Sequence, residues 1–438
     1  MTTKLHLRKN YSFYFKHFVI ITLCVFLNNH VMTAQMRLGS IEPIRLEKDV
    51  CIYRPDPNPK KSFIPVTNQV KLRMANNTSN SRTIITGDCS TFDITYTGFT
   101  ETAETAFSYA VQIWANSIVS SQTIKINADF APLGAGILGG AGADLYYFIT
   151  GPNIPANTLF PSALADALLD QDNNTSGTDI NATFSSTFPF YFGTDGNTPT
   201  GQYDFVSVVL HEIGHGLGIA GFGRQENGLG ALRVSTLYSG IWDQYIENGS
   251  NTSVLNYADP SIALLGQFTG GNLFSNGPET TVQNGNVNPK TYAPNPFQTG
   301  SSYSHWDEAT YPAGNANSLM TPQIGAGEAI HDPGKVTLGF MQDMFWTICG
   351  NLLSTIDASI SNVLTYYPNP VKNNITITAL NQNRIQKVKI FDILGKKIIE
   401  TSPNNIKSVL NLTSLENGIY IVKVSFEKTV ETFRVLKN

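Results

Sequence analysis

The chain has few charged side chains. Only 14% of its 438 residues are Asp, Glu, Lys or Arg, and the formal net charge is -4 at pH 7. Nucleic acids and anionic membrane surfaces bind strongly basic partners, so we expect neither to bind this protein. The hydrophobic fraction of 41% is large enough, at this length, to bury a sizeable core in two domains or more.

Long apolar runs are also missing. The apolar stretch at residues 18–27 is about half the length of a membrane-spanning helix, which needs about 20 residues, and no later stretch is long enough either. We therefore expect no transmembrane anchor. The stretch follows four basic residues and precedes a small-residue cleavage site, Thr33-Ala34-Gln35. This order predicts a secretory signal peptide at residues 1–34, with the mature chain beginning near Gln35.

Cysteine is scarce. Of the four cysteines, Cys24 lies in the predicted signal peptide, which leaves Cys51, Cys89 and Cys349. An oxidising compartment favours one disulfide, most simply Cys51 with Cys89, although the sequence does not fix the pairing. A second interpretation is that the thiol of Cys51 occupies the open position of a metal and holds a precursor inactive.

One short motif predicts a metal site. The apolar residues at the start of the stretch 208–218 suggest a helix, which would place His211 and His215 one turn apart on the same face. Two imidazoles can then bind one ion, and zinc accepts such ligands. Glu212 would remain available for proton transfer. The alternative is a pair of hydrogen-bonded core histidines. Gly218 favours the metal interpretation because it allows a left-handed turn just after the helix.

Three segments resemble a known family. The motif His211-Glu212-x-x-His215-x-x-Gly218 resembles the zinc helix of the metzincin metalloproteases, but Gly221 stands where most members have a third ligand. Residues 304–306 and 318–322, with the sequences Ser-His-Trp and Ser-Leu-Met-Thr-Pro, resemble the third-histidine segment and methionine turn of the leishmanolysin-like members. In those proteins an insertion, here residues 221–303, precedes the last ligand. Residues 337–346 are similar to the closing helix.

The resemblance implies an α+β fold, with a metzincin-like catalytic domain at residues 89–352 in which a twisted sheet lies over the zinc helix. It implies a secreted zinc endopeptidase that acts on proteins or peptides. Zn2+ would be bound by His211, His215 and His305, with Glu212 as the general base and Met320 as an apolar floor beneath the metal. The edge strand that binds peptide is expected near residues 143–149.

Local patterns predict further elements of this domain. Residues 92–96 and 124–128 alternate as strands do, and residues 102–118 have helical spacing. Asp204 is expected to cap the zinc helix. Residues 35–88 are predicted to be a leader or short propeptide. Residues 170–179 collect oxygen ligands that could bind calcium, but a solvated polar loop is favoured because the sequence lacks the closing glutamate of an EF-hand.

Several alternatives stay open. Glu247 would be the third ligand in a gluzincin-type peptidase, and His331 is another candidate, although a surface histidine is the simpler interpretation. Tyr303 and Tyr311 could assist an oxyanion, although packed tyrosines are more common. A non-catalytic surface adhesin on the same scaffold is a rival function. The presence of Glu212 argues against the adhesin, because a scaffold without turnover has no need for that carboxylate.

The last part of the chain has a different pattern. From residue 362 to 438, short alternating strands are separated by turn residues, which predicts a small all-β sandwich. This segment resembles the type A C-terminal sorting domain of proteins exported by the type IX secretion system. The resemblance implies a bacterium with two membranes, contact with that secretion machinery, and delivery to the outer cell surface or the medium. An accessory binding module is the alternative.

Overall fold

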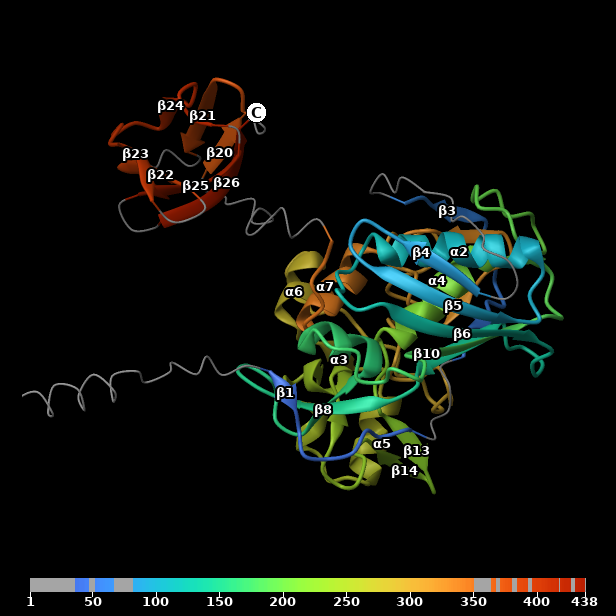
Figure 1. Cartoon of the computed structure of the whole chain (residues 1–438). Coiled ribbons are helices and arrows are strands. Elements are labelled where there is room, and N and C mark those ends of the chain that lie inside the picture. The colour runs from blue at the N-terminus through green and yellow to red at the C-terminus, as the bar shows by residue number, and fades with distance from the viewer. Residues whose placement is uncertain are drawn as a thin grey trace, which may run out of the picture.

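The computed structural model describes two hydrophobic cores (Figure 1). The described residues are 36–46, 52–66 and 82–349, followed by 364–367, 371–379, 384–392, 396–416, 418–426 and 430–437. The predicted signal peptide and Cys51 lie outside them. One core is built from residues between 53 and 348 and the other from residues between 364 and 435. Within the described ranges, no helix combines the length and apolar character needed to cross a bilayer.

A five-stranded sheet packs one of its faces on the larger core (Figure 1). Its order is β4 (Arg82–Thr86), β5 (Thr91–Thr97), β6 (Ile124–Ala131), β10 (Ile180–Ser185) and β7 (Gly139–Ala143). β5, β6 and β10 run parallel, and the two edge strands β4 and β7 run antiparallel to their neighbours. Alternate residues of β5, such as Phe92 and Ile94, are buried. One face of the sheet is therefore packed and the other faces solvent.

Two helices cover the packed face. α2 (Glu101–Ala115) and α4 (Phe205–Gly216) contact each other, and α4 also packs on β7 and β10. The Nε1 of Trp114 in α2 donates a hydrogen bond to the carbonyl oxygen of Leu210 in α4, at 2.9 Å. The sequence predictions of strands at 92–96 and 124–128, and of the helix near 102–118, are confirmed. β4 joins this sheet although it precedes residue 89, the predicted beginning of the catalytic domain.

The predicted position of the edge strand was wrong. The main sheet ends at β4 and β7, whereas residues 143–149 mostly form β8, which lies between β1 and β9 in a second sheet. Five small residues, Gly-Gly-Ala-Gly-Ala, make up β7, and they have no alternating pattern to detect. The second sheet has the order β1 (Arg37–Leu38), β8 (Tyr146–Thr150), β9 (Thr158–Pro161) and β15 (Ser239–Gly240).

Shorter helices and strand pairs complete the region of the larger core. The remaining helices are α3 (Ser162–Leu169), α5 (Ile262–Thr269), α6 (Pro278–Gln283) and α7 (Lys335–Asp343), with 3-10 turns η1 (Trp242–Tyr245) and η2 (Val254–Asn256). α7 confirms the helix expected near residues 337–346. The strand pairs are β11 (Phe190–Tyr191) with β12 (Tyr203–Asp204), β13 (Arg224–Glu226) with β14 (Leu229–Ala231), β16 (Ile246–Asn248) with β17 (Leu273–Ser275), β2 (Arg54–Pro55) with β18 (Gln323–Ile324), and β3 (Ser62–Ile64) with β19 (Glu328–Ile330).

A disulfide joins Cys89 to Cys349, so the expected pairing of Cys51 with Cys89 was wrong. The end of α2 lies between the two cysteines. The amide of Cys89 donates to the carbonyl of Ala115, and the amide of Cys349 donates to the carbonyl of Ser117. Proximity in sequence is a weak guide to pairing because the entropy of closing a loop grows only slowly with its length.

We expect this disulfide to contribute measurably to stability. It closes a loop of 260 residues, and removing a crosslink of this kind gives the unfolded chain more freedom. Replacing both Cys89 and Cys349 by Ser should lower the free energy of unfolding by about 2–4 kcal/mol in urea denaturation. The same loss should appear in the unaltered protein after reduction, and equal stabilities of oxidised and reduced protein would contradict the prediction.

The C-terminal residues form two antiparallel sheets with a shared core. The first contains β20 (Leu364–Tyr367), β21 (Asn374–Ala379) and β24 (Lys407–Asn411), and the second contains β23 (Lys397–Thr401), β22 (Lys387–Phe391), β25 (Gly418–Ser425) and β26 (Val430–Lys437). Ile375 and Ile377 of the first sheet and Val388, Val422 and Val424 of the second are buried in one cluster. The predicted small all-β sandwich is confirmed.

Candidate metal centre

The helix α4 is capped as the sequence predicts. An Oδ1 atom of Asp204 accepts a hydrogen bond from the backbone amide of Ser207 at 2.8 Å, which satisfies one of the free donors of the first turn. The other carboxylate oxygen accepts from the hydroxyl of Thr198 at 2.9 Å. All twelve residues of α4 are buried. The cap therefore fixes the start of a helix that has no exposed face.

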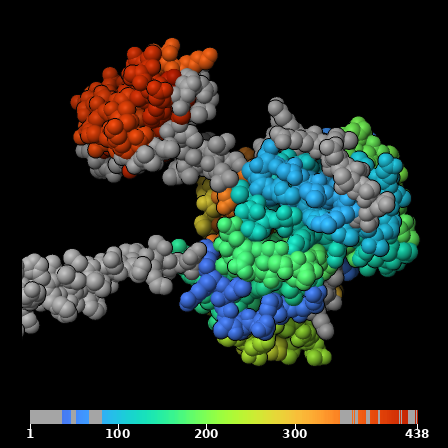
Figure 2. All heavy atoms as spheres, viewed as in Figure 1, coloured from blue at the N-terminus to red at the C-terminus, as the bar shows by residue number. Residues whose placement is uncertain are grey.

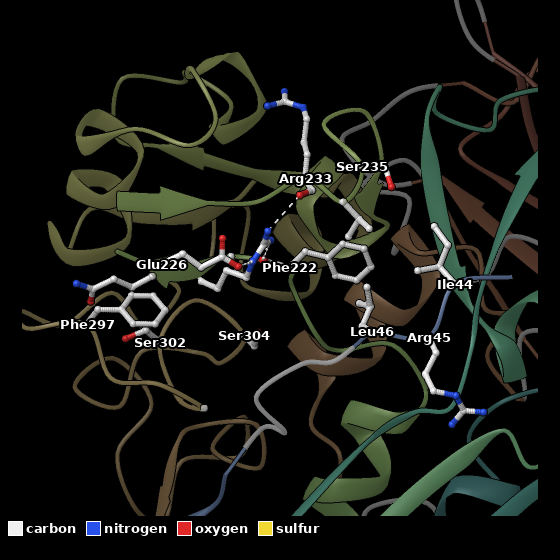
Figure 3. A pocket seen from close by; sticks show the side chains of 15 residues that line it. Ile44, Arg45, Leu46, Phe222, Glu226, Arg233, Ser235, Phe297, Ser302 and Ser304 are labelled. Atoms are coloured by element: carbon white, nitrogen blue, oxygen red, sulfur yellow. Dashed lines mark hydrogen bonds and ion pairs between the residues drawn. The ribbon is translucent and has the colours of Figure 1, made fainter. Parts of the chain in front are cut away.

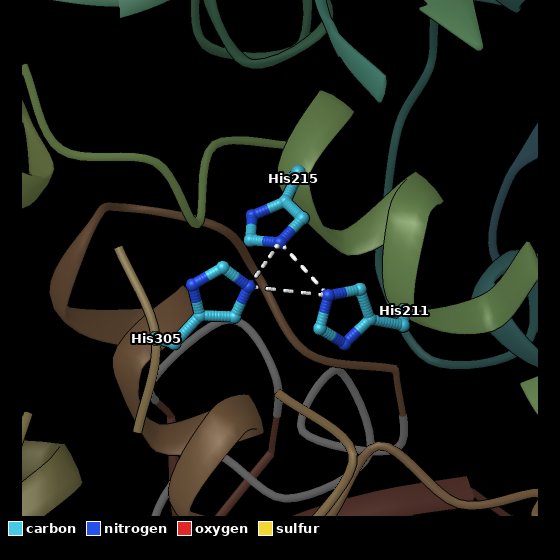
Figure 4. Close-up of side chains that lie close together, drawn as sticks. All are labelled: His211, His215 and His305. Carbon is cyan, nitrogen blue, oxygen red and sulfur yellow. Dashed lines mark hydrogen bonds between the residues drawn. The ribbon is translucent and has the colours of Figure 1, made fainter. Parts of the chain in front are cut away.

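Three histidines converge at the end of this helix (Figure 4). His211 and His215 project from consecutive turns of α4, and His305 comes from a loop 90 residues beyond His215. Their Nε2 atoms are separated by 3.0 Å for His211 and His215, 3.1 Å for His215 and His305, and 3.3 Å for His211 and His305. All three side chains are fully buried. The fold thus brings together the three residues predicted to be metal ligands.

The outer nitrogen of each ring is held by a backbone carbonyl. The Nδ1 atoms of His211 and His305 lie 2.6 Å from the carbonyl oxygens of Leu319 and Ser301. The Nδ1 of His215 contacts the carbonyl oxygen of Ile219. A carbonyl oxygen only accepts hydrogen bonds, so each Nδ1 carries the proton and each Nε2 presents its lone pair to the centre. This is the tautomer that a metal needs.

The spacing of the three nitrogens fits zinc. Tetrahedral coordination with Zn–N bonds of about 2.0–2.1 Å places two ligand nitrogens about 3.3–3.4 Å apart. The observed Nε2 separations, from 3.0 to 3.3 Å, are close to this value. Burial, together with the neighbouring His215 and His305, lowers the pKa of His211 well below its ordinary value. A lowered pKa favours the neutral imidazole, which is the form that can act as a ligand.

Met320 packs against the helix that carries two of the three histidines. It is fully buried, and a Cβ atom added to Gly214 would lie 2.9 Å from its sulfur, so the methionine packs directly on α4. The carbonyl of Met320 accepts a hydrogen bond from the amide of Trp306, next to His305. Gly218 has a φ of +123°, as the predicted turn requires. Met320 therefore ties the third histidine to the helix.

Glu212 lies on α4 beside the first histidine and is fully buried. The negative charge of Glu212 is one cause of the raised pKa of Tyr53. Burial first, and then the carboxylates of Glu328, Glu308 and Glu212, raise the pKa of Tyr53 well above its ordinary value of 10. A carboxylate next to the ligand set, and not needed as a ligand, is able to accept and return a proton.

The rival ligands lie elsewhere. The carboxylate of Glu247 accepts hydrogen bonds from the amide groups of Asn276 and Asn288, at 2.7 and 3.1 Å. His331 is 1% exposed, so the expectation of a surface histidine was wrong. Its Nε2 lies 2.9 Å from Asp204, at the opposite end of α4 from the three histidines. The described residues thus bring His305, and neither of these two, to the histidine pair.

The two candidate tyrosines are held by hydrogen bonds away from the ligand set. The hydroxyl of Tyr303 donates to the carboxylate of Asp243 at 2.9 Å, and that of Tyr311 contacts the side chain of Asn284 at 3.0 Å. Both rings are buried in the core. Neither is assigned a role at the oxyanion.

The acidic loop at residues 170–179 is organised by protein donors. The Nζ of Lys125 contacts the carboxylate of Asp172 at 2.5 Å and the carbonyl of Asn174 at 3.1 Å. The carboxylate of Asp179 accepts from the backbone amide of Lys125. A lysine ammonium therefore lies where the loop oxygens converge, and we propose no calcium site there.

A cavity of about 470 Å³ is lined by residues of the insertion and by Ser302 and Ser304 (Figure 3). Its lining includes Ser304, which precedes His305, and Phe222, which follows α4. Further walls come from residues 223–226 and 233–235 of the insertion and from residues 44–46. The three arginines at its edge each contact an acid, so the cavity has no large excess of charge; the pairs are Arg45–Asp144, Arg224–Glu226 and Arg233–Asp259.

Sequence reasoning missed Tyr53. Its ring stacks on that of His211, with ring centroids 3.7 Å apart and an interplanar angle of 5°. Tyr53 is fully buried, although it lies in the segment predicted to be a leader. The only signal was an apolar pair, Ile52-Tyr53, within an otherwise polar segment.

Comparison with known proteins identifies the C-terminal part. Residues 365–438 match the family of secretion system C-terminal sorting domains, which confirms the prediction for this segment. The tail therefore directs the protein through the type IX secretion system to the cell surface or the medium. No curated protein matches the chain.

The solved structures that match include one with a limited similarity. It is PorZ, a bacterial surface component of the type IX secretion system of Porphyromonas gingivalis, at 23% sequence identity and a TM-score of 0.16. The match covers 19% of this chain and 12% of that chain. At this score it carries no argument about the fold of the larger part.

Proposed function

We propose that the protein is a secreted zinc-dependent endopeptidase of the metzincin type. The observation that supports this most directly is the set of three Nε2 atoms within 3.3 Å of one another, each ring fixed by a carbonyl on its Nδ1. Three lone pairs at this distance repel one another unless a cation lies between them. His211, His215 and His305 would hold Zn2+, which leaves a position for water and distinguishes a catalytic from a closed structural site.

When bound, the zinc would polarise the scissile carbonyl and make a water molecule a better nucleophile at neutral pH. Glu212 would accept the proton of that water and deliver it to the nitrogen of the leaving amine. The three backbone carbonyls keep the imidazoles in the required tautomer throughout. Met320 supports the site from below, and the cavity beside Ser304 would receive a side chain of the substrate.

The peptide would be held in an extended conformation. β7 is one of the two antiparallel edge strands of the main sheet, and an edge strand offers unpaired amide and carbonyl groups to an added chain. The packing of β7 on α4, the helix that carries His211 and His215, supports this proposal. The assignment of the C-terminal tail to type A is part of the same proposal.

Metal removal tests this function. The exported protein should contain about one zinc per chain and should hydrolyse an unfolded protein such as casein. A strong chelator should abolish this hydrolysis, and added Zn2+ should restore it, because the water is activated only when the metal is bound. Element analysis and release of labelled peptides are the two measurements. Hydrolysis that persists in protein shown to be free of metal would exclude the proposal.

A further inference from the structure

Gly221 lies shortly after α4, and two rings pack against its backbone. A Cβ atom at this position would lie 2.2 Å from the ring of Tyr303 and 2.5 Å from that of Trp242. The ring of Tyr303 also covers Gly223, where an added Cβ would lie 2.4 Å from it. These distances are far below the roughly 3.5–4.0 Å at which carbon atoms attract one another, so no side chain fits at residue 221. The space just after α4 is instead filled by a residue two positions before His305.

The residues around His305 are held on two sides. On one side, the amide of Gly221 donates to the hydroxyl of Ser304 at 3.1 Å. On the other side, the amide of Tyr303 donates to the carbonyl of Tyr292 at 2.7 Å, and the amide of Tyr292 donates to the carbonyl of His305 at 2.8 Å. This segment therefore lies between the chain that follows α4 and Tyr292, and its register determines where the imidazole of His305 reaches.

Asp243 joins these parts. Figure 2 shows yellow-green atoms of the insertion at the lower edge of the larger part, but Asp243 itself is 0% exposed. Its Oδ1 atom accepts from the hydroxyl of Tyr303 at 2.9 Å and from the amide of Phe222 at 3.0 Å. Its Oδ2 atom accepts from the amide of Gly240 at 2.7 Å. Hydrogen bonds to a charged group are stronger than neutral ones, so this carboxylate joins the chain after α4 to the segment of His305.

The backbone of Tyr303 is unfavourable by itself. Its φ is +76°, in the left-handed region that bulky residues rarely adopt, and such a conformation persists only where the surroundings fix it. Glycine at this position would form the same turn without the cost in free energy. The side chain supplies what glycine lacks, namely a fully buried ring and a hydroxyl that reaches Asp243. Burial and the charge of Asp243 raise the pKa of Tyr303 well above its ordinary value of 10, so the hydroxyl keeps the proton that it donates.

We propose that Tyr303 and Asp243 are positioning residues for the third metal ligand. The ring of Tyr303 and its hydrogen bond to Asp243 fix the register of His305 against the chain that follows α4, so that the Nε2 of His305 lies 3.1 Å from that of His215. Neither of the two residues belongs to the group that could hold the metal. This inference rests on the proposed function for the presence of the metal, and it does not depend on which bond the protein hydrolyses.

The test measures the zinc affinity of the exported protein by competition with a chelator. Tyr303→Phe keeps the ring and removes only the hydroxyl, and it should weaken zinc binding by about 10- to 100-fold, the usual effect of losing a partner that orients a ligand. Asp243→Asn should do the same. The double variant should bind zinc about as tightly as the weaker single variant, because both changes remove one shared link. The visible spectrum of the Co2+-loaded protein should change in each variant, since it reports the arrangement of ligands around the ion.

Tyr311→Phe is the matched control. The hydroxyl of Tyr311 contacts Asn284 at 3.0 Å, and its ring is buried in the same core. This variant should bind zinc as tightly as the unaltered protein does and should give the same Co2+ spectrum. Urea denaturation of the metal-free proteins establishes that each variant is folded, so a general loss of stability is distinguished from misplacement of the ligand. If Asp243→Asn does not fold, the comparison of Tyr303→Phe with Tyr311→Phe decides.

Equal zinc affinities of folded Tyr303→Phe and Tyr311→Phe would overturn the inference. Additive effects in the double variant would also overturn it, because the two residues would then act separately. A protein that binds no zinc would refute the metal centre and the inference together. If the unaltered protein binds zinc tightly but hydrolyses no protein, while Tyr303→Phe loses affinity, the positioning role stands and the peptidase function fails.

Discussion

Replacing Glu212 by Gln is expected to reduce protein hydrolysis by about 100- to 10,000-fold, the range that a well-placed general base contributes. The amide has nearly the same shape but cannot take the proton of the attacking water. Zinc content should stay near one per chain, because the three ligand imidazoles are untouched. The comparison is made in the exported protein, with the unaltered sequence as the reference.

The matched control is Glu247→Gln. This glutamate is also buried, but its carboxylate is bonded to Asn276 and Asn288 and lies outside the histidine cluster. Its replacement should leave both hydrolysis and zinc content near their original values. If Glu247→Gln loses zinc, Glu247 is a ligand and the gluzincin-type alternative is correct. If Glu212→Gln keeps its activity, the proposed base is wrong.

His305→Ala should remove the metal. Two histidines on one helix cannot enclose zinc without a third ligand, and loss of an outer-shell partner alone typically costs about 10- to 100-fold in affinity. We expect a larger loss here, seen as zinc content far below one per chain after dialysis and as hydrolysis below detection. His211→Ala should give the same result.

A buried histidine outside the centre provides the control for His305→Ala. His331→Gln can still donate to Asp204, and it should retain zinc because His331 lies at the other end of α4. Folding of each variant is checked by urea denaturation. Retention of zinc by a folded His305→Ala chain would require another third ligand and a new assignment of the site.

The part of the centre that lies on α4 could be predicted from local sequence. His211, His215, Glu212 and the cap at Asp204 could be placed because helical spacing and capping depend on neighbouring residues. His305 could not be placed in this way, since it is 90 residues from His215. Only its similarity to a third-histidine segment pointed to it, and the described structure brings it to the other two.

The errors share a physical cause. The Cys89–Cys349 pairing, the edge strand β7 and the contact of Tyr53 with His211 all depend on long-range packing. None of them leaves a periodic pattern in the chain. Small residues such as Gly139 form an edge only because β10 lies beside them. The segment that contains Tyr53 has little apolar character, and its docking sites lie on β7 and β18.

The disulfide between Cys89 and Cys349 also determines how a nicked molecule behaves. It spans α4, the insertion and His305. A single cut anywhere between the two cysteines leaves both fragments covalently attached as long as the medium is oxidising. Such a molecule keeps its full mass on a non-reducing gel and separates into two bands only when a thiol is added.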